Sequence, residues 1–285
     1  MRLDIFRSLW GATTDWPTCV RQLREAGCVG IEARLPPTRG QRQQLRARLN
    51  EEGLAYIGIV FSGGDVVPRQ QDTPEQHLDH LARMLEAADA LAPRFINVLA
   101  GNDRWPLAQQ VDFFGRALAL ADAAAVVCSF ETHRATSLYS PWLTLELIRQ
   151  VPELRFTADI SHWVVVAERL PDHPLDDFQP FIDRVHHIQA RVGYAQGPQV
   201  PHPAAPEYSA ELAFHQAFWQ AVWHAQRNQG YPVATLTPEF GPDGYLHHLP
   251  FTDVPVTDLW SLNDWMARCE RQHFERWLQH SPVPT

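Results

Sequence analysis

Acidic side chains end three apolar, strand-like runs of this 285-residue sequence. The run VVCSFE ends at Glu131, RFTAD ends at Asp159, and VATLTPE ends at Glu239. A charged side chain gains little from core packing, whereas at a strand end it can hold a metal ion or a polar substrate. We therefore expect these acids to do chemistry if the three strand ends meet.

A fourth run, VHHIQAR, offers His187, Gln189 and Arg191. Alternate residues of a strand point the same way, so these three side chains share one face. Three carboxylates together with one amide or imidazole form an oxygen-rich ligand set. Such a set suits Mn²⁺ or Mg²⁺, with Co²⁺ or Zn²⁺ as alternatives. No cysteine belongs to the set, and this argues against a structural zinc site.

The elements that must position these residues alternate between short apolar runs and amphipathic stretches, which is typical of an α/β fold with parallel strands. Strands are expected at 3–10, 29–35, 55–61, 94–100, 126–131, 155–159, 185–191 and 233–239. Helices are expected from Asp15 to about Gly27 and at 41–52, 73–91, 106–124, 140–151, 174–182, 210–229 and 258–279.

Eight strand–helix units predict a single (β/α)8 TIM barrel, a fold that typically takes ~250 residues. We expect one domain over 1–285, with the barrel over about 1–256 and a C-terminal helical extension over about 257–285. Chemistry in such barrels sits at the C-terminal strand ends, so the four runs should converge there. Long loops at 193–208 and 241–256, after strands seven and eight, are expected to cover the site.

Composition and charge exclude several classes of function. All 24 basic residues are arginine, which excludes Schiff-base enzymes, pyridoxal phosphate enzymes and P-loop nucleotide hydrolases. A net charge of −9 argues against a nucleic-acid partner, because phosphate binding needs a basic face. Scattered cysteines, no secretion signal and no apolar run of membrane-spanning length predict a cytoplasmic protein that acts on a small molecule and contacts no membrane.

The four strand ends resemble those of the xylose isomerase-like TIM-barrel superfamily, which contains sugar phosphate isomerases and epimerases. The matching motifs are SFETH, ADISHW, HHIQAR and TPEF, in this order along the chain. The resemblance implies one divalent metal, Mn²⁺ before Mg²⁺, Co²⁺ or Zn²⁺, bound by Glu131, Asp159, Gln189 and Glu239. Gln189 stands where ketose epimerases have a histidine, although hydroxypyruvate isomerase-like members share the HIQ sequence. His187 is the alternative ligand.

The resemblance also implies a reaction in which a 2-hydroxy carbonyl compound chelates the metal, and the metal acidifies the adjacent C–H group. One glutamate removes that proton to give a cis-enediolate, and the proton returns at the neighbouring carbon or on the opposite face. Glu131 and Glu239 correspond to this acid/base pair. The substrate-binding candidates are His133, His162, His187 and Arg191. We therefore expect a metal-dependent isomerase or epimerase of a sugar or small hydroxy-carbonyl compound.

Three other functions remain open on the same fold. These are dehydration of a polyol ketone, hydrolysis as in endonuclease IV, and binding of a sugar or a partner without catalysis. Endonuclease IV needs three zinc ions and a basic face for DNA, and the net charge of −9 disfavours that face. A purely binding barrel would bury several acids without a metal, which is costly.

Individual residues also have structural alternatives. Asp159 could cap the turn at Ser161, Gln189 could hydrogen-bond within the barrel, and Glu32 could point into the barrel mouth. The terminal helix carries Trp260, Trp265 and Trp277. Its aromatic surface predicts packing on the barrel or on another subunit, so the sequence also allows a homo-oligomer.

Overall fold

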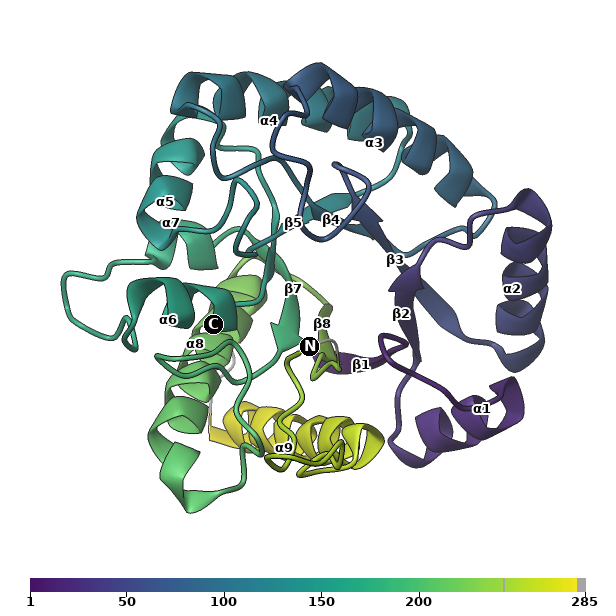
Figure 1. The fold of residues 1–285 in the computed structure, drawn as a ribbon, viewed down its shortest axis with the longest axis vertical. Helices are drawn as coiled ribbons and strands as arrows, with labels where there is room; N and C mark the ends of the chain where they lie inside the picture. Colours follow the sequence, from purple (N-terminus) through teal and green to yellow (C-terminus); the bar gives the residue numbers. More distant parts are fainter. Residues whose placement is uncertain (243, 281–285) are drawn as a thin grey trace.

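The computed structural model describes residues 1–242 and 244–280, and it contains the expected TIM barrel. Eight parallel strands pair in chain order, and β8 pairs with β1 to close the sheet (Figure 1). The strands are β1 (Arg2–Ser8), β2 (Gly30–Arg34), β3 (Ala55–Phe61), β4 (Ile96–Leu99), β5 (Cys128–Glu131), β6 (Phe156–Ala158), β7 (Val185–Ala190) and β8 (Val233–Pro238).

Helices connect the strands and surround the barrel (Figure 1). They are α1 (Trp16–Glu25), α2 (Arg39–Glu52), α3 (Pro74–Asp89), α4 (Leu107–Ala123), α5 (Pro141–Gln150), α6 (Ser161–Ala167), α7 (Gln179–Ile182), the 3₁₀ turn η1 (Pro206–Tyr208), α8 (Ser209–Asn228) and α9 (Leu259–His280). The expected C-terminal helix is α9, which lies between α8 and α1. It buries Leu262, Met266, Phe274 and Trp277, so its aromatic face packs on the barrel of the same chain.

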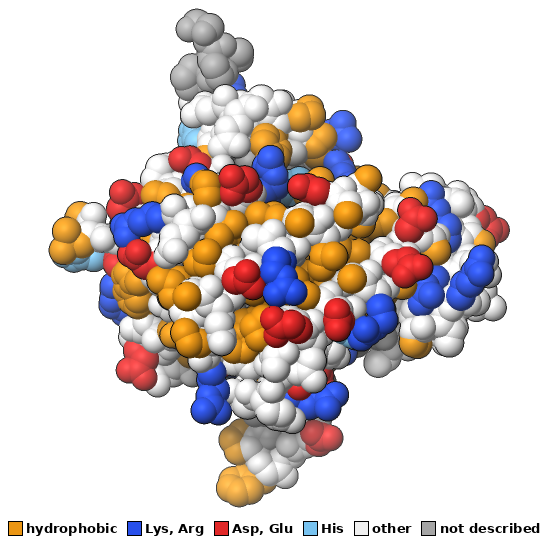
Figure 2. All heavy atoms as spheres, turned by 90° about the horizontal axis from the view of Figure 1, so that it is seen from above, with side chains coloured by type: hydrophobic (Ala, Val, Ile, Leu, Met, Phe, Trp, Pro, Cys, Tyr) orange, Lys and Arg blue, Asp and Glu red, His pale blue; other side chains and the backbone are white. Residues whose placement is uncertain are grey.

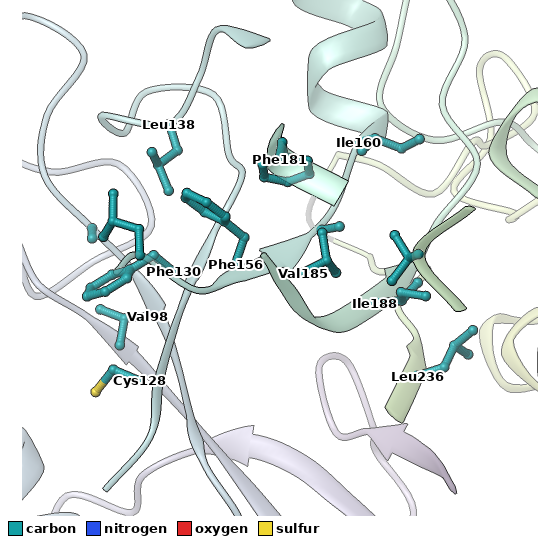
Figure 3. Packing of buried hydrophobic residues seen from close by; sticks show 14 of the residues in the cluster. Val98, Cys128, Phe130, Leu138, Phe156, Ile160, Phe181, Val185, Ile188 and Leu236 are labelled. Carbon is teal, nitrogen blue, oxygen red and sulfur yellow. The ribbon is translucent and has the colours of Figure 1, made fainter. Parts of the chain in front are cut away.

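Strand alternation separates the hydrophobic core from the candidate site. Figure 3 shows Phe130 of β5 near Cys128 and near Phe156 of β6, and all three belong to the hydrophobic core. Ser129 and Glu131 alternate with these core residues along β5, so their side chains point to the opposite face, inside the barrel. The same alternation on β7 and β8 places the buried polar residues His187, Gln189, Thr235 and Thr237 on the inner face.

The chain between β6 and β7 differs from the expectation. The sequence predicts one helix at 174–182, but the structure has α6 directly after β6 and only a short turn, α7, before β7. Three successive valines at 164–166 have a low helix propensity, so α6 is not recognisable from the sequence. Burial of Val164 overrides that preference. Leu175 is 85% exposed, so the first part of the predicted helix has no apolar face to pack.

The two long loops after β7 and β8 are bound to each other. Gly241 donates its N–H to Oε1 of Gln199 at 2.9 Å, and the Gln199 amide donates to the Gly241 carbonyl at 3.3 Å. The ring of His247 contacts the Gln199 carbonyl oxygen at 3.1 Å. Because Gln199 is buried, these contacts hold the loops as one wall on the β7–β8 side of the barrel mouth.

The outer surface shown in Figure 2 lies on the side of α3 and α4. Acidic and basic side chains are interspersed there between apolar areas, so this face has no large patch of positive or negative charge. Among the described residues, no helix combines the length and the hydropathy of a membrane span.

Candidate active site

Three carboxylates from different strands converge at the C-terminal end of the barrel. One oxygen each of Glu131, Asp159 and Glu239 lies within 4.8 Å of the other two. All three side chains are buried. Glu131 ends β5, and the other two follow β6 and β8 directly, so the parallel strands bring together residues that are distant in sequence. This is the convergence that the sequence predicts.

Amide groups hold the two glutamates. Asn97 on β4 donates its Nδ2–H to Oε2 of Glu131 at 2.6 Å. Gln189 on β7 donates its Nε2–H to Oε1 of Glu239 at 3.0 Å. Each amide binds only one oxygen of its glutamate, so the amides orient the carboxylates without neutralising them.

Asp159 is fixed through both its backbone and its side chain. The Thr132 hydroxyl donates to the Asp159 carbonyl, and the Asp159 N–H donates to the same hydroxyl, each at 2.9 Å. Oδ1 accepts the Ser161 N–H at 3.1 Å. Asp159 therefore caps the turn into α6, which is the structural role allowed by the sequence, and its Oδ2 faces the site, where it accepts a hydrogen bond from Arg191.

Burial and mutual repulsion disfavour the charged forms of these acids. Burial raises the pKa of Glu131 well above its usual value, and the Asp159 charge raises it further. Burial likewise raises the pKa of Glu239 well above its usual value, with Glu131 adding to the shift. Burial also raises the pKa of Asp159, although less strongly because Arg191 opposes it. A cation between the carboxylates would remove this repulsion.

Arg191 lies against the carboxylates. Its Nη2 group donates to Oδ2 of Asp159 in a short hydrogen bond and lies 3.7 Å from Oε2 of Glu239. Burial alone would lower the pKa of Arg191, but the charges of Asp159 and Glu239 raise it above its usual value. The guanidinium also lies 4.8 Å from the ring centroid of Tyr245. Arg191 is therefore a fixed positive charge in the site.

Two neutral histidines lie against each other beside the acids, with their ring planes tilted by 49°. The ring centroids of His133 and His162 are 3.9 Å apart. Burial and the Arg191 charge lower the pKa of His133 to about 3, and burial together with His133 lowers the pKa of His162 well below its usual value. Nε2 of His162 accepts a hydrogen bond from Arg191 at 2.8 Å. These histidines can offer polar contacts to a ligand without adding charge.

Beneath this group lies a network around Glu32 on β2. Glu32 accepts hydrogen bonds from Asn97 and Gln189, each at 3.3 Å. Nε2 of His187 lies 3.5 Å from Glu32, and its Nδ1 lies 2.9 Å from the Thr235 hydroxyl. Glu32 and Asn97 are the site residues that sequence reasoning did not assign. The available signal was a polar residue inside each of the apolar runs GIEA and INVL.

The residues present fit a hard divalent cation. Three oxygen donors face one another, and Oε1 of Gln189 is buried with no hydrogen-bond partner within residues 1–242 and 244–280. An unpaired buried amide oxygen is costly unless a ligand completes it. Three carboxylates and an amide oxygen match the preferences of Mg²⁺ or Mn²⁺. His187 lies outside the carboxylate group.

A cavity of about 780 Å³ opens above the carboxylates. Glu131, His133, Arg191 and Glu239 line it on the polar side, together with Tyr245 from the loop after β8. Asp159, His162, His187 and Gln189 lie behind these residues and are not part of the lining. The cavity therefore opens onto both glutamates of the predicted acid/base pair.

Comparison with known proteins gives one matching family model. A model described as a xylose isomerase-like TIM barrel matches residues 20–209. No curated protein sequence matches the chain. Solved structures with a similar fold include sugar epimerases, a dehydratase and endonuclease IV.

Three of these structures illustrate the similarity. A xylose isomerase-like TIM barrel protein from Mycobacterium smegmatis, in complex with magnesium, has a TM-score of 0.67 and 14% identity, over 96% of this chain and 97% of its own. L-ribulose 3-epimerase has a TM-score of 0.64 and 14% identity, over 99% and 100%. The probable 3-DHS dehydratase from Bacillus anthracis has a TM-score of 0.60 and 15% identity, over 95% and 98%. At such identities the likeness establishes the fold alone.

Proposed function

Since the chain belongs to the xylose isomerase-like TIM-barrel family, we propose that it is a divalent-metal-dependent isomerase or epimerase. Its substrate would be a sugar or another hydroxy-carbonyl compound, and the reaction would pass through a cis-enediolate of that substrate. The observation that carries the proposal is the meeting of Glu131, Asp159 and Glu239 beneath the cavity.

The metal would be held by these three acids and by Oε1 of Gln189. Bound there, a divalent ion supplies Lewis-acid polarisation of a substrate carbonyl and lowers the pKa of the adjacent C–H group. Mn²⁺ and Mg²⁺ fit the oxygen donors best, with Co²⁺ or Zn²⁺ as alternatives. The magnesium complex of the similar Mycobacterium smegmatis protein supports this choice.

Glu131 and Glu239 would move the proton. They approach the cavity from β5 and from the end of β8, so they can meet a substrate from two sides. One carboxylate would take the proton from the carbon next to the carbonyl, and the other would return it. Return at the neighbouring carbon isomerises the substrate, whereas return on the opposite face epimerises it.

Arg191 would stabilise negative charge on the substrate oxygens, because its guanidinium is fixed beside the carboxylates and lines the cavity. His133 lines the same cavity and would contact the substrate directly. His162 would contact the substrate beside Arg191, or hold that arginine in place. His187 lies deeper, beside Glu32, so its predicted substrate contact needs a ligand that reaches past Gln189.

A metal-dependent dehydratase is the second candidate, because one similar structure is a probable 3-DHS dehydratase. Dehydration begins with the same proton removal and ends with loss of a hydroxyl group. Hydrolysis as in endonuclease IV has less support. It would require a basic DNA-binding face, and the chain carries a net charge of −9.

The proposal is tested by proton exchange in deuterated water. The Mn²⁺-loaded protein is incubated with a panel of ketoses, keto-glycosides and other hydroxy-carbonyl compounds, and deuterium incorporation next to the carbonyl is followed by NMR. We expect exchange with at least one compound, and a loss of about 10²–10⁴-fold in Glu131→Gln and Glu239→Gln. Water loss without return of the proton would identify the dehydratase. No exchange in any compound class, with metal bound, would contradict the proposal.

A further inference from the structure

The cavity above the carboxylates has two chemically different halves. Strands β5, β7 and β8, with the segments that directly follow them, contribute its charged and polar lining, which includes Glu131, Arg191 and Glu239. Strands β1 to β4, with the turns that follow them, contribute an apolar lining. We call this second half the apolar wall, and its residues are Leu9, Ala33, Ile59, Phe61, Val66 and Leu99.

The apolar wall offers no hydrogen bonds from its own side chains. The one charged lining residue on that half, within the part of the chain that the structure describes, is Arg34. Its side chain is exposed and its guanidinium lies 4.5 Å from the centroid of the Phe61 ring. Glu32, on the same strand, is turned inward and engaged by Asn97 and Gln189. Sugar hydroxyls placed against this wall would lose water and gain no partner.

The cavity has room beyond the part that lies over the carboxylates. Its volume of about 780 Å³ lies in the range of sites that bury a drug-sized molecule, roughly 300–1,000 Å³. The polar half, over the carboxylates, is where a hydroxy-carbonyl group can react. The rest of the space is bounded by the apolar wall and by the ring of Trp10, whose centroid lies 5.7 Å from the Arg191 guanidinium.

We propose that the substrate carries an aromatic body joined to the hydroxy-carbonyl end that reacts. The reactive end would lie over the carboxylates, and the ring would pack between Phe61 and Ile59 on one side and Trp10 on the other. An aromatic ring suits this place because it buries apolar area and packs on other rings in offset or edge-on geometry. The inference rests on the proposed function for the reacting end and adds the substrate class.

The test uses two metal chelators that share one head group. Acetohydroxamate and 3-phenylpropionohydroxamate both bind a divalent ion through the hydroxamate, and only the second carries an aromatic ring. Their dissociation constants are measured by calorimetry on the Co²⁺-loaded full chain. We expect the phenyl compound to bind at least tenfold more tightly, a difference of about 1.4 kcal/mol.

Variants locate the effect. Phe61→Ser and Ile59→Thr each make the apolar wall more polar, and each should reduce the preference for the phenyl compound to about threefold or less while acetohydroxamate binds as before. Val127→Ser is the matched control, because Val127 is 43% exposed and immediately precedes β5, at the opposite end of the barrel. Val127→Ser should bind the phenyl compound in preference to acetohydroxamate by the same factor as the wild type.

The outcomes separate this inference from the proposed function. Equal affinities for the two chelators in the wild-type protein would overturn the aromatic-substrate inference and leave the metal centre intact. A preference that survives both wall variants would overturn it as well, because the ring would then bind elsewhere. Failure of both chelators to bind the Co²⁺-loaded protein would contradict the metal centre itself, and the inference would fall with it.

Discussion

Either Gln189 or His187 could be the metal ligand from β7, and the contacts of Gln189 distinguish the two arrangements. Its Nε2 is engaged with Glu239 and Glu32, while its Oε1 is buried and has no partner among the described residues. That orientation leaves the better metal donor free. His187, the alternative ligand, is instead directed to Glu32 and Thr235.

We therefore predict that Gln189→Leu lowers the affinity for Mn²⁺ by about tenfold or more, the size of effect that loss of a metal-orienting group produces. His187→Gln should change the affinity by less than about threefold on the same scale. Both are measured by titrating metal-free protein in a calorimeter. The opposite ranking of the two variants would make His187 the ligand from β7.

At the residue scale, the sequence predicted that the three carboxylates converge, but it did not predict the residues that hydrogen-bond to them. Glu131, Asp159 and Glu239 each follow an apolar run, and the parallel barrel brings such ends together. Glu32 and Asn97 sit in the middle of strands. Whether a mid-strand residue points inward, and at which height, depends on strand tilt and pairing register, and no single run contains that information.

At the element scale, close backbone contacts set the spacing of the strands beneath the site. Gly30 of β2 pairs with Ala55 of β3, and a Cβ atom at Gly30 would lie 2.1 Å from the Ala55 carbonyl oxygen. No side chain can fit there unless the two strands separate. Gly40, in the first turn of α2, has no atom within 4 Å of the same position.

We predict opposite effects for the same substitution at these two glycines. Gly30→Ala should lower the free energy of unfolding by at least about 1–3 kcal/mol, because the added methyl overpacks the β2–β3 pair. Gly40→Ala should raise it by up to about 1 kcal/mol through the lower entropy of the unfolded chain. Urea unfolding measures both. A neutral Gly30→Ala would mean that β2 and β3 can adjust freely.

Elements differed in how well the sequence specified them. Buried parallel strands are nearly continuous apolar runs, so all eight were recognised. Helix α6 was missed because its valines favour strand locally and only tertiary packing makes them helical. Of the helix predicted at 174–182 only α7 forms, because the exposed Leu175 gives the first part of that segment nothing to pack against.

At the scale of the whole molecule, buried neutral histidines link stability to pH. Nδ1 of His215 donates to the Glu211 carbonyl at 2.8 Å, and Nε2 accepts the Gly193 N–H at 3.3 Å, which requires the neutral ring. Burial lowers the pKa of His215 to about 4. Between pH 6.5 and about pH 4, His215 is protonated in the unfolded chain but neutral in the folded chain. The free energy of unfolding therefore falls as the pH is lowered through this range.

Replacing His215 by glutamine should remove this dependence, because glutamine keeps a donor and an acceptor but does not titrate. We predict that the stability advantage of the wild type over His215→Gln shrinks by about 1.6 kcal/mol between pH 6.5 and pH 5.0. Urea unfolding at the two pH values measures it, with the exposed His248→Gln as control. A constant difference would mean that His215 titrates in the folded protein with the same pKa as in the unfolded chain.

The measurement that tests the central claim most directly is the metal content of the purified full chain, with Glu131→Gln and Asp159→Asn prepared in parallel. The carboxylate centre predicts about one Mn, Mg, Co or Zn per wild-type chain after incubation with these metals and removal of excess, and loss of that ion in both variants. Wild-type protein that retains no divalent metal, or variants that retain it fully, would contradict a metal-dependent enzyme built on these three acids.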